Sequence, residues 1–68
     1  MQTIFEIYKV TRDAREYIGK TPIKEQAVNA AKTGAKENSC IYEVTMISES
    51  VGIRTVAYHS NGSIEKLW

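Results

Sequence analysis

One segment predicts a helix whose apolar face is built almost entirely from small residues. Thr21 is a favourable N-cap, and Pro22 suits the first helical position, where its missing N–H costs nothing. The helix is predicted from Ile23 to about Glu37, with Asn38 as a left-handed C-cap. One arc of about 160° collects the apolar residues Ala30, Ile23, Gly34, Ala27, Ala31, Ala35 and Val28. Such a helix can approach a sheet closely, so the large core side chains have to come from strands.

A strand pattern precedes this helix. Residues 3–10 (TIFEIYKV) are β-branched, aromatic and apolar on both faces, which is typical of a strand inside a sheet or under a covering element. Alternation places Phe5 and Ile7 on one face, and the other face carries Ile4, Tyr8 and Val10. After a turn at 11–14, residues 15–19 (REYIG) are predicted as a short second strand, with an ordered loop as the alternative.

An antiparallel meander follows the helix. Residues 40–48 alternate and predict a strand with one apolar face, which carries Cys40, Tyr42, Val44 and Met46. A turn at 49–52 leads to a predicted strand at 53–59. The pair Asn61-Gly62 predicts a type I′ turn, which needs positive φ at both central positions, before a last strand at 64–68.

The order β-β-α-β-β-β predicts an α+β fold in which one antiparallel β-sheet carries a single helix on one face. Residues 1–68 are expected to form a single domain. A chain of this size buries only about 60% of its unfolded surface, so a thin core with little room for a catalytic pocket is expected. The sheet face without a helix is then available for partner contact.

Several protein classes are excluded by simple counts. One Cys and one His provide neither an internal disulfide nor a zinc-ligand set, so we expect no metal, no cofactor and a reducing, cytoplasmic setting. Apolar runs are far shorter than the roughly 20 residues that span a bilayer. Met1 leads directly into a strand pattern without signal-peptide features, so no membrane partner is expected.

The residues that carry catalytic chemistry are not arranged for it. His59 and Ser60 are neighbours at a strand end and point to opposite faces, while Cys40 is best interpreted as a small buried hydrophobe. The glycines at 19, 34, 52 and 62 do not form a phosphate-binding loop. We therefore predict no catalytic residues, no small-molecule substrate and no enzyme activity.

The net charge of +1 hides a marked asymmetry along the chain. Residues 9–36 carry seven basic and three acidic side chains, whereas the rest carries two basic and five acidic ones. Lys32 and Lys36 are four residues apart and share one edge of the predicted helix. A locally basic surface attracts anionic partners without a high net charge.

The second half of the chain resembles a known family. The segments Ala30-Ala31-Lys32, Lys36-Glu37, Cys40, 41–47, Gly52, Ala57-Tyr58, Asn61-Gly62 and Trp68 are similar to small type I-F anti-CRISPR proteins of phages and other mobile elements. The resemblance covers about residues 27–68, with a weaker match over the first strand, while residues 11–20 differ. It implies a five-stranded antiparallel sheet with one helix.

The resemblance also implies a function. Members of that family bind backbone subunits of a host CRISPR surveillance complex, obstruct the hybridisation of target DNA with the guide, and promote non-specific DNA binding by the complex. Lys32, Asn38 and Ser39 match contact positions, while Thr33 stands where the family tends to carry a second basic residue. We therefore expect partner contacts at Lys32, Lys36, Asn38, Ser39, Arg12, Arg15 and Arg54. The alternative is a phage or plasmid accessory protein that binds nucleic acid through the same basic face.

Overall fold

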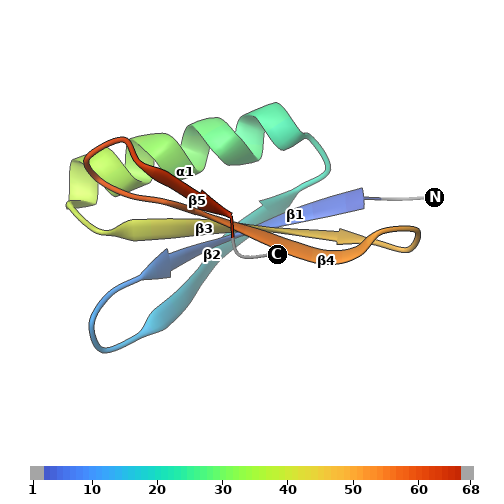
Figure 1. The fold of residues 1–68 in the computed structure, drawn as a ribbon, viewed down its shortest axis with the longest axis horizontal. Helices are drawn as coiled ribbons and strands as arrows, with labels where there is room; N and C mark the ends of the chain where they lie inside the picture. The colour runs from blue at the N-terminus through green and yellow to red at the C-terminus, as the bar shows by residue number, and fades with distance from the viewer. Residues whose placement is uncertain (1–2, 67–68) are drawn as a thin grey trace.

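The computed structural model describes residues 3–66, and its elements follow the order β-β-α-β-β-β (Figure 1). Strands β1 (Thr3–Val10) and β2 (Arg15–Thr21) precede helix α1 (Lys24–Asn38). Strands β3 (Ile41–Ser48), β4 (Gly52–Tyr58) and β5 (Ile64–Lys66) follow it. All pairings are antiparallel, and the strands form one five-stranded sheet in the order β2-β1-β3-β4-β5. The predicted α+β class and element order are confirmed.

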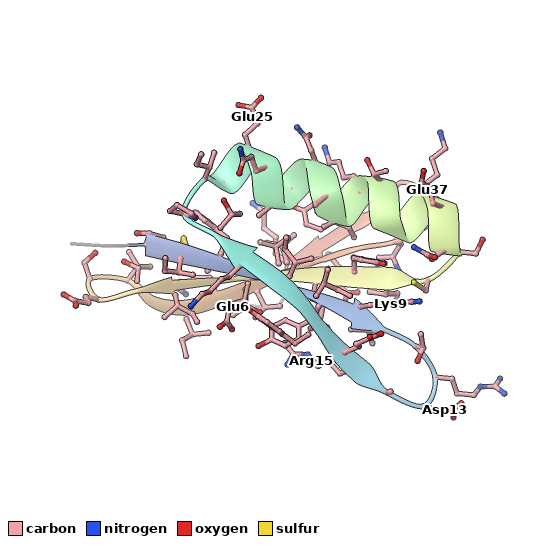
Figure 2. All side chains as sticks on the ribbon, turned by 180° about the vertical axis from the view of Figure 1, so that it is seen from behind. Glu6, Lys9, Asp13, Arg15, Glu25 and Glu37 are labelled. Atoms are coloured by element: carbon pink, nitrogen blue, oxygen red, sulfur yellow. The ribbon has the colours of Figure 1, made fainter. Side chains whose placement is uncertain are left out.

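Helix α1 covers only one face of this sheet. It lies over β1 and β3 and also reaches β2 and β4, as Figure 1 shows with the helix along one side of the sheet. Within residues 3–66 no helix has both the length and the apolar character needed to cross a membrane. The sheet face opposite α1, which we call the open face, carries no second layer formed by these residues (Figure 2).

The core lies between α1 and the centre of the sheet. The predicted alternation of β1 and β3 is confirmed, because Phe5, Ile7, Tyr42 and Val44 are buried on the face toward the helix. As predicted, β1 is an interior strand, between β2 and β3, and its second apolar face, with Ile4, Tyr8 and Val10, is only half-buried. The helix contributes only alanines to the fully buried set, Ala27, Ala31 and Ala35.

The helix begins later than predicted. Thr21 is not its N-cap, because β2 continues to Thr21, which pairs with Phe5 in β1, and Ile23 occupies the N-cap position. The Thr21 hydroxyl nevertheless accepts a hydrogen bond from the Ile23 N–H at 3.1 Å. The predicted apolar arc is also too wide, since Ile23 is 49% exposed and Ala30 is exposed.

The helix also ends one residue later than predicted. The left-handed cap is Ser39, with φ 52° and ψ 45°, and Asn38 is still helical. The Cys40 N–H donates to the Ala35 carbonyl at 3.2 Å, so this amide closes the helix and β3 begins at Ile41 rather than Cys40. The second strand is real and extends two residues beyond the predicted Gly19.

The β4–β5 connection is a turn, but not of the predicted type I′. Gly62 has φ +93°, whereas Asn61 does not have a positive φ. The Gly62 N–H donates to the His59 carbonyl at 3.0 Å, and Asn61 Oδ1 accepts from the Ser63 N–H at 2.9 Å. The longer turn removes His59 from the predicted strand. Of the predicted last strand, 64–66 is confirmed as β5, and 67–68 lie outside the described residues.

Candidate functional site

Three segments far apart in the sequence meet at one end of the molecule. A groove lies between the C-terminal half of α1 and the β4–β5 turn, and Lys32, Lys36 and residues 58–64 line it. A second hollow lies beside it and is lined by residues 10–12, 38–41 and 59–60. His59 and Ser60 line both hollows. We call this surface the basic end and define it by Arg12, Lys32, Lys36, Asn38, Ser39, His59 and Ser60.

Local structure accounts for the positions of the helical members of the basic end. Lys32 and Lys36 are one turn apart on α1, so both side chains face the β4–β5 turn, as their spacing predicts. Asn38 is held in place, because its Nδ2 donates to the Gly34 carbonyl at 3.0 Å and to Tyr42 Oη at 3.1 Å. The left-handed Ser39 then turns the chain sharply into β3.

The charge of the basic end is not balanced within it. Neither hollow is lined by an Asp or Glu side chain. In the part of the chain that the structure describes, the ion pairs join Arg15 to Glu43 and His59 to Glu65, and none involves Arg12, Lys32 or Lys36. These three cations are therefore available to an anionic group of a partner.

Two predicted contact residues lie elsewhere. Arg15 is on the sheet face opposite α1, where its Nε lies 3.0 Å from Glu43 Oε1 (Figure 2). Arg54 pairs with Met46 in the register of β3 and β4, toward the end of the sheet opposite the basic end. The structure thus brings together Lys32, Lys36, Asn38, Ser39 and Arg12, and separates Arg15 and Arg54 from them.

His59 and Cys40 line the same hollow, but they do not form a catalytic pair. The His59 Nε2 lies 3.3 Å from Glu65 Oε1, and the Glu65 side chain is 61% exposed. No hydrogen bond joins the Cys40 thiol to the His59 ring among the contacts of residues 3–66, and Cys40 packs against the core. In the same residues no three His, Cys, Asp or Glu side chains gather as metal ligands.

A network on the opposite sheet face was not predicted from the sequence. The Tyr8 hydroxyl donates to Glu6 Oε1 at 2.8 Å, and the Arg15 guanidinium carbon lies 3.7 Å from the centroid of the Tyr8 ring. Tyr17 meets the Tyr8 ring edge-on at 5.6 Å. Part of this network is indicated by the sequence, because the alternation of β1 puts Glu6 and Tyr8 on one face. The positions of Arg15 and Tyr17 depend instead on the register of the hairpin.

Tyr8 is expected to titrate late in the folded protein. The hydrogen bond to Glu6 is the main cause that raises the pKa of Tyr8 above its ordinary 10.0, followed by burial and by the Glu6 charge, while Arg15 lowers it. Because the folded state holds this proton more tightly, the stabilisation is complete below pH 10.0 and is lost as the pH rises through the folded-state pKa. Absorbance at 295 nm, with Tyr8→Phe subtracted, measures the titration.

Glu6→Gln is the informative variant for this titration. It replaces the carboxylate that accepts the Tyr8 hydrogen bond, which is the largest cause of the raised pKa, and it removes the Glu6 charge. The pKa of Tyr8 should therefore move back toward its ordinary value. Burial alone raises the pKa of Tyr58, so this tyrosine serves as an internal control and should be unchanged. An unchanged Tyr8 titration in Glu6→Gln would show that the hydrogen bond is not formed in solution.

Comparisons with known proteins identify no relative of this chain. No protein-family model matches the chain, and neither the curated proteins nor the solved structures contain a significant match.

Proposed function

We propose that this protein is an anti-CRISPR-like inhibitor that binds the backbone subunits of a CRISPR surveillance complex in the host cytoplasm. It obstructs the hybridisation of target DNA with the guide by occupying a surface, without catalysis. The observation that carries the proposal is the basic end, where Lys32, Asn38 and Ser39, which match contact positions of the type I-F inhibitors, lie in one continuous surface with Lys36 and Arg12. Its unbalanced cations favour contact with carboxylates or phosphates.

The size of the molecule is compatible with inhibition by occupancy. A standard protein interface buries about 800 Å² on each partner. The accessible surface of the chain is 4683 Å², so an interface of that size would take roughly a sixth of it. The basic end lies at one extremity of a particle of 35 × 20 × 20 Å, which leaves the rest of the molecule free to stand in the path of an incoming strand.

The proposal is tested with the purified chain and a purified type I-F surveillance complex. We expect the wild-type chain to bind the immobilised complex and to abolish the mobility shift of a labelled target duplex. Lys32→Glu combined with Lys36→Glu should weaken binding about tenfold or more, because two attractive contacts become repulsive. Lys20→Glu combined with Lys24→Glu is the matched control, since both lysines are exposed and outside the basic end, and should bind normally.

Each outcome of this experiment has a clear meaning. If the wild-type chain does not associate with the complex, the anti-CRISPR form of the proposal is wrong. If the two double variants weaken binding equally, the effect is one of net charge, and the basic end is not the contact surface. A correct fold of each variant is checked by its circular dichroism spectrum and thermal unfolding.

The second candidate function is direct binding of nucleic acid through the basic end. The cations Arg12, Lys32 and Lys36 favour it, because neither hollow is lined by a carboxylate, although Glu65 Oε1 lies 3.3 Å from the His59 ring that lines both. Fluorescence anisotropy of a labelled 20-nucleotide strand, measured over a salt series, separates the two candidates. A binding constant whose logarithm falls steeply with the logarithm of the salt concentration supports the second function, since each phosphate contact to a single strand adds about 0.7 to the slope.

A further inference from the structure

The groove between α1 and the β4–β5 turn has the size and lining of a site for a small anionic molecule. Its volume is about 360 Å³, which lies within the range of small-molecule pockets. One wall is the C-terminal half of α1, and the other is the turn at residues 59–63, which lies beside the helix (Figure 1). The two walls come from distant parts of the chain, so the groove exists only in the folded protein.

The helix wall of the groove supplies two positive charges. Lys32 and Lys36 are one turn apart, and neither forms an ion pair or a hydrogen bond with another of residues 3–66. Like charges at this spacing repel each other, so an anion placed between them relieves the repulsion. The carbonyls of Gly34 and Ala35, near the negative end of the helix dipole, are already hydrogen-bonded, and neither residue lines the groove.

The turn wall of the groove offers hydrogen-bond donors that the described chain does not use. The N–H groups of Ser60 and Asn61 have no acceptor among residues 3–66, whereas those of Gly62 and Ser63 do. Asn61 Oδ1 accepts from the Ser63 N–H at 2.9 Å, which leaves the Nδ2 group of the same side chain without an acceptor in this part of the chain. The hydroxyls of Ser60 and Ser63 also form no hydrogen bond within residues 3–66. The turn can therefore donate several hydrogen bonds to one bound group.

Acidic side chains do not line this groove within the described residues. Glu65 is tied to a lining residue, because its Oε1 lies 3.3 Å from His59 Nε2. Glu65 and Ile64 are neighbours in β5, so their side chains point to opposite faces, and only Ile64 lines the groove. The other charged side chains next in sequence to the lining residues, Glu37 and Lys66, are not part of the lining either. The groove is thus a cationic site rich in donors.

A phosphomonoester suits these groups better than a carboxylate does. It has three terminal oxygens and a charge of about −1.5 to −2 at pH 7, which two lysines balance. Its oxygens can accept from both walls at once, whereas a carboxylate has one charge and two oxygens. Ile64 lines the same groove and is 53% exposed, so it can cover the carbon skeleton of the ligand.

We propose that this groove binds the phosphate group of a small phosphomonoester of about the size of a nucleotide. Lys32 and Lys36 hold the phosphate oxygens from the helix side, the turn at residues 60–63 donates hydrogen bonds from the other side, and Ile64 packs against the rest of the molecule. The site goes beyond the proposed function, because it takes a free small molecule and needs no CRISPR complex.

The test is a ¹H–¹⁵N NMR titration of the whole chain with AMP, adenosine, 3′,5′-cyclic AMP and ribose 5-phosphate. AMP should shift the backbone amides of Lys32, Lys36 and residues 60–63. Adenosine lacks the phosphate and cyclic AMP has only the single charge of a diester, so both should bind at least about tenfold more weakly. Ribose 5-phosphate identifies the source of the phosphate: binding equal to that of AMP indicates a sugar phosphate, and weaker binding indicates a nucleotide.

Two double variants test the two walls of the groove separately. Lys32→Gln combined with Lys36→Gln should weaken AMP binding about tenfold or more, because charge-assisted hydrogen bonds are lost. Ser60→Ala combined with Ser63→Ala should weaken it about fivefold, because only neutral hydrogen bonds are lost. A loss from the serine pair distinguishes a two-walled site from simple attraction by the lysines.

The matched control is Lys20→Gln combined with Lys24→Gln, since both lysines are exposed and outside the groove, and it should bind AMP normally. Equal losses in the two lysine pairs, or unchanged binding by the serine pair, would overturn the proposal. So would cyclic AMP that binds as tightly as AMP, or succinate that shifts the same amides at lower concentration, since the groove would then recognise a diester or a carboxylate. A chain that binds AMP but not the surveillance complex contradicts the proposed function alone, and the reverse result contradicts this site alone.

Discussion

Replacing Gly34 with valine is expected to destabilise the domain by about 3 kcal/mol or more. A Cβ atom at Gly34 would lie 2.6 Å from two carbons of the Tyr42 ring, closer than nonbonded carbons approach one another. The ring has little freedom to retreat, because Tyr42 is 7% exposed, packs in the core and accepts a hydrogen bond from Asn38. Valine adds two methyl groups at this point, so the helix has to lift from the sheet.

Two further variants make this prediction specific. Gly34→Ala should be destabilising by a smaller amount, since overpacking of about 1–3 kcal/mol is partly offset by up to about 1 kcal/mol of helix propensity. Ala30→Val is one turn earlier on the exposed side of α1 and should cost only the difference in propensity, about 0.6 kcal/mol. Urea unfolding followed by circular dichroism measures all three. Equal losses for Gly34→Val and Ala30→Val would mean that α1 does not approach Tyr42 closely.

This close approach shows which parts of the fold could be predicted from the sequence. The Ala and Gly face of the helix and the period-two alternation of β1 and β3 are local patterns, and each specifies its buried side directly. The element order follows from them. The sequence also indicated that large core side chains would come from the strands, and Phe5, Ile7, Tyr42, Val44 and Tyr58 supply them.

The errors occur where a hydrogen bond that the local composition does not indicate decides the outcome. Thr21 has the side chain of an N-cap, but its pairing with Phe5 extends β2 and delays the helix. Asn61-Gly62 has the composition of a type I′ turn, yet the Asn61 side chain accepts the Ser63 N–H and only Gly62 takes a positive φ. In both cases the local preference is real but is overridden by a longer-range hydrogen bond or by a competing side-chain contact.

The residues of the candidate site could likewise be grouped correctly from the sequence only where the signal is local. Lys32 and Lys36 could be grouped from the sequence because their helical spacing is local. Arg15 and Arg54 were grouped with them by charge alone, and the register of the sheet moves one to the open face and the other toward the opposite end. In β2, Ile18 has no partner in β1, since Gly19 pairs with Ile7 and Tyr17 with Tyr8. Such a bulge sets where Arg15 points and cannot be inferred from composition.

Replacing Phe5 with alanine is expected to remove from about a third to all of the stability of the protein. Phe5 is 7% exposed and is one of only five large side chains in the buried cluster, whose other members are alanines of α1. Truncation of a buried Phe costs about 3–5 kcal/mol, and a domain of 68 residues has a total stability of about 3–10 kcal/mol.

Ile53→Ala is the matched control for Phe5→Ala, because it removes a large apolar side chain from the same sheet on the open face, where Ile53 is 68% exposed. It should change the free energy of unfolding by no more than about 0.5 kcal/mol. Thermal and urea unfolding of both variants compare the two faces of the sheet directly. If Ile53→Ala lowers the free energy of unfolding as much as Phe5→Ala does, the open face is covered in solution, for example by a second copy of the chain. A second copy would then be identified by unfolding midpoints that rise with protein concentration. A small loss at Phe5 would instead contradict a core placed between α1 and the sheet, since no other element of the described chain could make up for the contacts of this ring.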